Sequence, residues 1–195
     1  MEQSESKRSG QLPELIPPHG GYRDLKSYQM AEIVHDATVV FCNRFIDRRS
    51  RTNGQMVQAA RSGKQNIAEG SMASGTSKKT ELKLVGVARA SLEELLLDFE
   101  DYLRQKGLAL WGKEHAKAKE VRRLCYKQNR SYTTYKTYIE ASPPEIACNT
   151  MVCVINQTNY LLDQQLRALD KEFLKEGGFT ERLYRTRSEM RKFQK

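Results

Sequence analysis

Asn66, Glu69, Gly70 and Ser71 place an amide, a carboxylate and a hydroxyl within one short stretch, NIAEGS. Such groups could carry out acid–base chemistry if a nucleophile or a second titratable group faced them. Residues 61–96 around the stretch contain neither a histidine nor a cysteine. We therefore expect a structural motif, in which Gly70 ends a helix with a positive φ and the polar side chains bond to backbone or to a neighbouring helix.

Metal chemistry has equally little support in the residue pattern. Glu32 and His35 match the Glu-x-x-His spacing of di-metal helical bundles, but the chain contains no second copy of that spacing. The three histidines are scattered, and the four cysteines form no CxxC pair: Cys42, Cys125, Cys148 and Cys153. We expect reduced cysteines, no metal, no cofactor and no enzymatic activity.

The formal net charge of +9 is concentrated in two segments. Residues 104–136 contain ten basic and two acidic side chains, and residues 175–195 contain seven and three. This clustering indicates a polyanionic partner, because an even scatter would serve only solubility. The candidate nucleic-acid-binding residues are Lys117, Lys119, Arg122, Arg123, Tyr126, Lys127, Arg130, Arg182, Arg185 and Arg187.

In this interpretation the basic side chains bind phosphates and tyrosines stack on unpaired bases. Helical spacing places Lys119, Arg122, Arg123 and Tyr126 near one another, and about three helical turns extend that face to Arg130. The alternative is a solvated basic helix whose tyrosines pack on the rest of the protein.

Apolar periodicity predicts an all-α protein of antiparallel helices, with an extra basic helical segment and a basic C-terminal tail. Residues 1–22 are expected to form a flexible leader without a secretory signal. A helical bundle domain is expected over residues 23–176, with residues 113–140 as a basic insertion. Residues 177–195 form a basic suffix that the pattern predicts to be a short amphipathic helix.

The expected helix ends follow from capping residues. The first helix starts at its N-cap Asp24, the second at Thr52 or Asn53, the third at its cap Ser77, and the last at Pro143. Gly70 is expected to end the second helix, Gly107 the third and Gly177 the last.

The last helix carries a heptad seam of apolar residues interrupted by Asn159, which fixes register or oligomeric state unless it is solvated. The seam consists of Cys148, Val152, Ile155, Asn159, Leu162, Leu166, Leu169 and Phe173. The second helix carries a stripe of small residues that includes Ala60 and Gly63. Together these faces exceed what one bundle needs, so we expect a homo-oligomer formed by ring closure.

The NIAEGS stretch, followed by ARASLEEL at residues 88–95, resembles a bacterial four-helix-bundle family. The family includes the proteins encoded in 23S rRNA intervening sequences and the accessory variability determinant of diversity-generating retroelements. The resemblance covers residues 24–108, and Ala90 stands where glycine is common. This chain resembles a longer form of the family, with an insertion and a suffix.

The resemblance implies an up-down four-helix bundle that assembles into a funnel-shaped homopentamer without enzymatic activity. For the retroelement members it also implies nucleic-acid binding and association with a reverse transcriptase. We therefore expect a cytoplasmic, oligomeric accessory protein that binds structured RNA or RNA/DNA and no membrane. The alternative is an oligomeric scaffold that binds an acidic protein partner without contacting nucleic acid.

Overall fold

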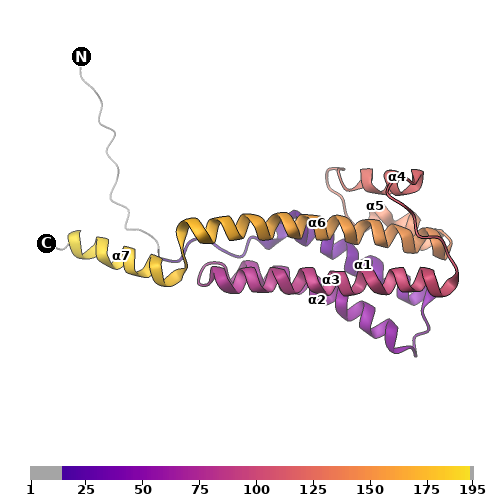
Figure 1. Ribbon diagram of the computed structural model, residues 1–195, viewed down its shortest axis with the longest axis horizontal. Helices are drawn as coiled ribbons and strands as arrows, with labels where there is room; N and C mark the ends of the chain where they lie inside the picture. Colours follow the sequence, from indigo (N-terminus) through magenta and orange to yellow (C-terminus); the bar gives the residue numbers. More distant parts are fainter. Residues whose placement is uncertain (1–14, 194–195) are drawn as a thin grey trace, which may run out of the picture.

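The computed structural model describes residues 15–193, so residues 1–14 of the expected leader and residues 194–195 of the expected suffix lie outside the described part. Every regular element in residues 15–193 is helical (Figure 1), which confirms the all-α prediction. In chain order the elements are η1 Tyr22–Asp24, α1 Lys26–Phe45, α2 Arg51–Ala73, α3 Lys78–Lys106, α4 Ala116–Leu124, α5 Tyr132–Lys136, η2 Thr137–Ala141, α6 Pro144–Glu176 and α7 Phe179–Phe193.

The four long helices α1, α2, α3 and α6 enclose the apolar core. α1 contacts α2 and α6, and α3 contacts the same two helices. Each helix contributes large side chains that are less than 2% exposed, such as Phe41, Met56, Phe99 and Ile155. The rings of Phe41 and Phe99 meet edge to face, with 4.9 Å between centroids. Burying each such side chain contributes about 1.5–3 kcal/mol to folding.

The NIAEGS stretch lies within a helix and not at its end, so the predicted role of Gly70 is wrong. α2 continues through Gly70 to Ala73, and Gly70 is not among the positive-φ glycines. A Cβ on Gly70 would lie 3.4 Å from the Glu81 carbonyl oxygen and 3.4 Å from Leu84 Cβ. The glycine therefore allows α2 and α3 to approach closely, and the connector begins at Ser74.

The polar residues of this stretch serve local structure. The Asn66 side-chain amide donates to the Ser62 carbonyl oxygen at 2.9 Å, as expected for a backbone-bonded amide. Ser71 is buried, and its carbonyl oxygen accepts a hydrogen bond from the Gly20 N–H at 3.2 Å. That bond ties the segment before α1 to the end of α2. Glu69 is exposed on the surface of α2 and makes no side-chain hydrogen bond or ion pair within residues 15–193, so the predicted bonding role is wrong for this residue.

Three predicted helix boundaries are confirmed, namely the start of α3 and the C-terminal ends of α3 and α6. The Ser77 hydroxyl oxygen accepts a hydrogen bond from the Thr80 N–H at 3.1 Å and so caps α3. Gly107, with a φ of 64°, ends α3, and Gly177, with a φ of 75°, ends α6. Only glycine adopts this left-handed backbone region without steric cost, which is why the sequence shows these ends clearly.

Three predicted helix starts are wrong. The N-cap of α2 is Ser50, and not Thr52 or Asn53, because the Ser50 hydroxyl accepts a hydrogen bond from the Thr52 N–H. The Asn53 side-chain amide instead donates to carbonyl oxygens at the end of α1. Asp24 belongs to the 3-10 turn η1, so Leu25 precedes α1. Pro143 is the N-cap of α6 and Pro144 its first residue, one position later than predicted.

The heptad seam of α6 faces the core of its own chain. Cys148, Ile155 and Leu162 are fully buried, and Asn159, 3% exposed, donates to the Glu93 carboxylate at 3.1 Å. Gly63 of the small-residue stripe packs against Leu92 of α3. Most of both faces is therefore buried within one chain, so these faces do not supply the surplus apolar surface from which an oligomer was inferred. The expected oligomer then depends on the family resemblance alone.

Candidate nucleic-acid interface

The basic insertion packs on the outside of α6 through its short helix α4 (Figure 1). Ala118 and Val121 are the buried face of α4, at 1% and 0% exposure. The Gln157 side-chain amide on α6 donates to the Arg122 carbonyl oxygen at 3.0 Å near the end of α4. Apolar packing and this hydrogen bond fix α4 relative to α6, so the backbone positions from which its basic side chains extend are defined.

The connection between α3 and α4 is fixed by one buried side chain of α6. Asn149 accepts a hydrogen bond from the Trp111 N–H at 2.8 Å and donates to the Ala109 carbonyl oxygen at 2.8 Å. Both polar ends of the amide are thereby satisfied, as burial requires. The Trp111 ring stacks on His115, with 4.8 Å between centroids. This arrangement holds the Trp111 ring beside α4.

A cleft of about 630 Å³ lies between α4 and α6. Its lining residues include no aspartate or glutamate. Four of them are cationic and three are aromatic: Lys113, Lys119, Arg122 and Arg123, and Trp111, Tyr126 and Tyr160. Clustered cations attract phosphates, and aromatic rings offer faces for base stacking. The site therefore combines the two kinds of contact that nucleic acids use.

A smaller cavity of about 190 Å³ adjoins this cleft on the side of α1. The two cavities share Tyr126, Gln157 and Tyr160 in their linings. The smaller one adds Lys26 and Arg130 to the basic residues, again without a carboxylate in the lining. Together they form one surface across α6, which we call the α4–α6 track and which has cations at both ends.

The charges of the track are only partly neutralised by the protein. Lys119 lies 2.6 Å from the Glu114 carboxylate and is, within residues 15–193, the one lining cation in an ion pair. The Arg122 guanidinium donates to the Lys113 carbonyl oxygen, which positions it but leaves its charge. Burial raises the pKa of the Cys153 thiol to about 11 despite the opposing charge of Arg122. Cys153 is therefore a neutral thiol at pH 7, with no thiolate for nucleophilic chemistry.

Lys119, Arg122, Arg123 and Tyr126 lie together in the cleft, as their spacing predicts. The prediction of a continuous basic helical face from Lys119 to Arg130 is wrong, because α4 ends at Leu124. Asn129, with a φ of 55°, lies in the turn that follows, and asparagine tolerates this conformation better than most residues.

The turn separates the later basic residues from the face of α4. Arg130 lines the smaller cavity, where its Nε lies 3.2 Å from Met30 Sδ on α1. Lys127 is exposed and lies outside both linings. Lys117 also lies outside them, with its Nζ 5.9 Å from the Trp111 ring centroid.

The basic suffix forms a separate surface. α7 extends beyond the C-terminal end of α6, whereas α4 lies near the other end of the long helices (Figure 1). Arg182 donates to the Gly75 carbonyl oxygen at 3.3 Å, and Arg185 donates to the Glu176 carbonyl oxygen. Arg187 is exposed on the same helix. The structure therefore does not bring these arginines to the track.

Sequence reasoning missed Tyr160, Trp111 and Lys26 as members of this site, and it placed Lys113 in the basic segment without including it among the candidate binding residues. Tyr160 follows the seam residue Asn159 on α6 and is 62% exposed, so it points away from the core. A large aromatic side chain outside the seam of an amphipathic helix was the available signal. The other tyrosines of the insertion do not join the site: Tyr135 is fully buried, and Tyr132 and Tyr138 are half-buried and donate to Glu140 and Glu120.

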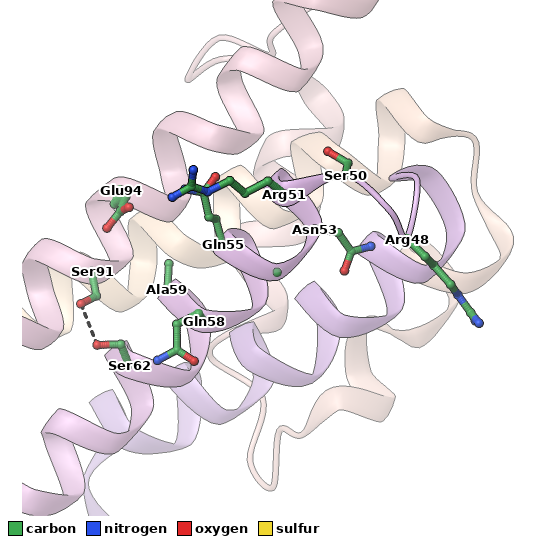
Figure 2. Close-up of a pocket in the computed structure, with 11 residues that line it drawn as sticks. Arg48, Ser50, Arg51, Asn53, Gln55, Gln58, Ala59, Ser62, Ser91 and Glu94 are labelled. Atoms are coloured by element: carbon green, nitrogen blue, oxygen red, sulfur yellow. Dashed lines mark hydrogen bonds between the residues drawn. The ribbon is translucent and has the colours of Figure 1, made fainter.

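Another cavity, of about 640 Å³, lies between α2 and α3 (Figure 2). Its lining mixes Arg48 and Arg51 with Glu94, and the hydroxyls of Ser62 and Ser91 bond to each other at 3.0 Å. In Figure 2, Arg51 extends toward α3, whereas Arg48 extends away from the other labelled side chains. The lining contains no histidine or cysteine. With mixed charge, no aromatic residue and paired hydroxyls, this cavity suits a polyanion less well than the track does.

Within residues 15–193, no cluster of three or more histidine, cysteine, aspartate or glutamate side chains is arranged to hold a metal ion. None of the helices in that range combines the length and the apolar character that crossing a membrane requires. No family model matches the chain, and searches of curated proteins and of solved structures found no match. The family resemblance thus stays a prediction.

Proposed function

We propose that this chain is a non-enzymatic accessory protein that binds structured RNA through the α4–α6 track. The observation that carries the proposal is the lining of the cleft between α4 and α6, which brings four cations and three aromatic side chains together and itself contains no carboxylate. Each phosphate that binds a lysine or arginine releases counterions, which makes the affinity sensitive to the salt concentration.

The rest of the proposal follows from the family resemblance. It comprises an up-down four-helix bundle of α1, α2, α3 and α6, a homopentamer, a cytoplasmic location and association with a reverse transcriptase. The cyclic contacts of the four long helices support the bundle. A ring would repeat the track around its axis and strengthen modest contacts by avidity. Light scattering tests the oligomer, because a monomer would have a mass of 22.5 kDa.

The binding proposal is tested by removing charge from the track without disturbing the fold. Lys113, Lys119 and Arg123 are exposed, so their joint replacement by glutamine should leave the core intact. We expect RNA affinity to fall strongly at near-physiological salt. Each lost phosphate contact should flatten the slope of log affinity against log salt concentration by about 0.7–0.9. Loss of the three contacts should therefore flatten it by roughly 2 to 3.

The matched control replaces Arg48, Arg49 and Arg51 by glutamine. These residues are also exposed, and the control removes the same charge from another surface. Filter binding at several salt concentrations measures affinity and slope, and circular dichroism checks folding. If both folded triple variants lost affinity equally, net charge and not the track would explain binding. If the parent protein bound no RNA, the alternative of a scaffold for an acidic protein partner would replace this proposal.

A further inference from the structure

We propose that the α4–α6 track takes an unpaired nucleic-acid strand, whose bases stack on Tyr126 and Tyr160, in preference to a duplex. This inference rests on the proposed function and specifies which part of a structured RNA the protein recognises. Three observations lead to it: the exposure of the two tyrosines, the position of the cations on both sides of them, and an unpartnered amide oxygen between the two cavities.

The two tyrosine rings are unusually exposed for this protein. Among the described residues, three tyrosines are more than half exposed: Tyr126 at 84%, Tyr160 at 62% and Tyr184 at 74%. Two of these three line one surface, although they come from different elements. The Gln164 side-chain amide donates to the Tyr160 hydroxyl at 2.8 Å, which steadies the ring on α6. Both rings therefore have an exposed apolar face that a ligand can cover.

The cations flank these rings. Lys113, Lys119 and Arg123 lie in the part of the track beside α4, and Lys26 and Arg130 lie in the part beside α1. A strand that crosses α6 would thus meet cations before and after it passes the tyrosines. Unpaired bases can be splayed out and stacked on aromatic side chains, with the phosphates bound by the flanking charges.

A duplex could use only half of this arrangement. Its base faces are stacked inside the helix, so exposed tyrosines would meet sugars and phosphates and gain no base stacking.

The Gln157 amide offers a further contact for an unpaired base. Its Nε2 is committed to the Arg122 carbonyl oxygen, while its Oε1 is buried and has no hydrogen-bond partner among the described residues. Because this oxygen is fully buried in the free protein, the Gln157 side chain would have to turn toward the strand before a base amino group could satisfy it.

The experiment compares an unstructured oligonucleotide of about 12 nucleotides, within the site sizes of single-strand binders, with a perfect duplex of the same length. Fluorescence anisotropy is measured for the parent, for the double variant Tyr126→Leu/Tyr160→Leu and for the control Tyr126→Phe/Tyr160→Phe. We expect the parent to prefer the single strand. Leucine should weaken single-strand binding by about tenfold per tyrosine without changing the salt slope, whereas phenylalanine should keep the affinity.

The outcomes separate this inference from the function on which it rests. Equal affinity of the parent for strand and duplex, or full affinity in the leucine variant, would overturn the inference. The RNA-binding proposal would still stand in that case if the Lys113, Lys119 and Arg123 triple variant lost binding. Failure of the parent to bind either probe would remove both. Parallel titrations with RNA and DNA strands of one sequence identify the polynucleotide, and preference for either strand over its duplex supports the inference.

Discussion

Gly63 lies on α2 directly against Leu92 of α3, and replacing it by alanine tests the packing of these two helices. A Cβ at this position would lie 2.6 Å from Leu92 Cδ2 and 2.7 Å from Leu92 Cγ. Leu92 is fully buried, so its side chain can move only by displacing other core atoms. Overpacking of this kind costs about 1–3 kcal/mol. Alanine also gains about 1 kcal/mol over glycine in a helix interior.

Gly86 supplies the matched control because it lies inside α3 with no atom within 4 Å of an added Cβ. Gly86→Ala should gain the same helix propensity without the clash and become about 1 kcal/mol more stable. Gly63→Ala should therefore be less stable than Gly86→Ala by about 1–3 kcal/mol. Urea unfolding followed by far-UV circular dichroism measures both free energies. Equal unfolding free energies for the two variants would refute the close packing of α2 on α3.

Two further predictions concern buried polar groups. Tyr135→Phe should raise the free energy of unfolding by roughly 1 kcal/mol, because the buried Tyr135 hydroxyl has no hydrogen-bond partner among the described residues; a less stable phenylalanine variant in urea unfolding would contradict this. Burial raises the pKa of Glu81 above its ordinary value of 4.5, against the opposing charge of Lys78. The folded state therefore holds this proton more tightly than the unfolded state, and the stability that the proton provides is present below pH 4.5 and lost as the pH rises through the raised pKa. Glu81→Gln should reduce the loss of stability between acid and neutral pH, and urea titrations at several pH values check this; an unchanged pH dependence would count against it.

The fold was predictable from the sequence wherever the signal is local. The all-α class follows from apolar residues spaced at the helical period, and α3 shows why its limits were accessible. Ser77 caps its start because its hydroxyl oxygen accepts a hydrogen bond from the backbone N–H three residues later, and Gly107 ends it through its own backbone conformation. Gly70 looked equally like a helix end, but its φ is not positive. A glycine needed for close helix packing and a glycine needed for a turn look the same in one sequence.

The candidate site was only partly predictable. Lys119, Arg122 and Arg123 lie within five consecutive α4 positions on neighbouring sides of the helix, so spacing sufficed to bring them together with Tyr126. Tyr160 lies on another helix, and only the packing of α4 on α6 brings it to the same cleft. The α7 arginines show the converse, because α7 and α4 lie near opposite ends of the long helices (Figure 1) and a shared charge sign does not imply a shared surface.

The sequence by itself determined the helices, several of their caps and the clustering of positive charge, because these depend on residues a few positions apart. The tertiary structure decided which charged and aromatic side chains face one another. It also decided that the α6 seam packs within its own chain, with Cys148 and Ile155 fully buried. An apolar stripe carries the same free energy of burial against any apolar partner. Its sequence therefore shows that it is buried, and only the packed structure shows against what.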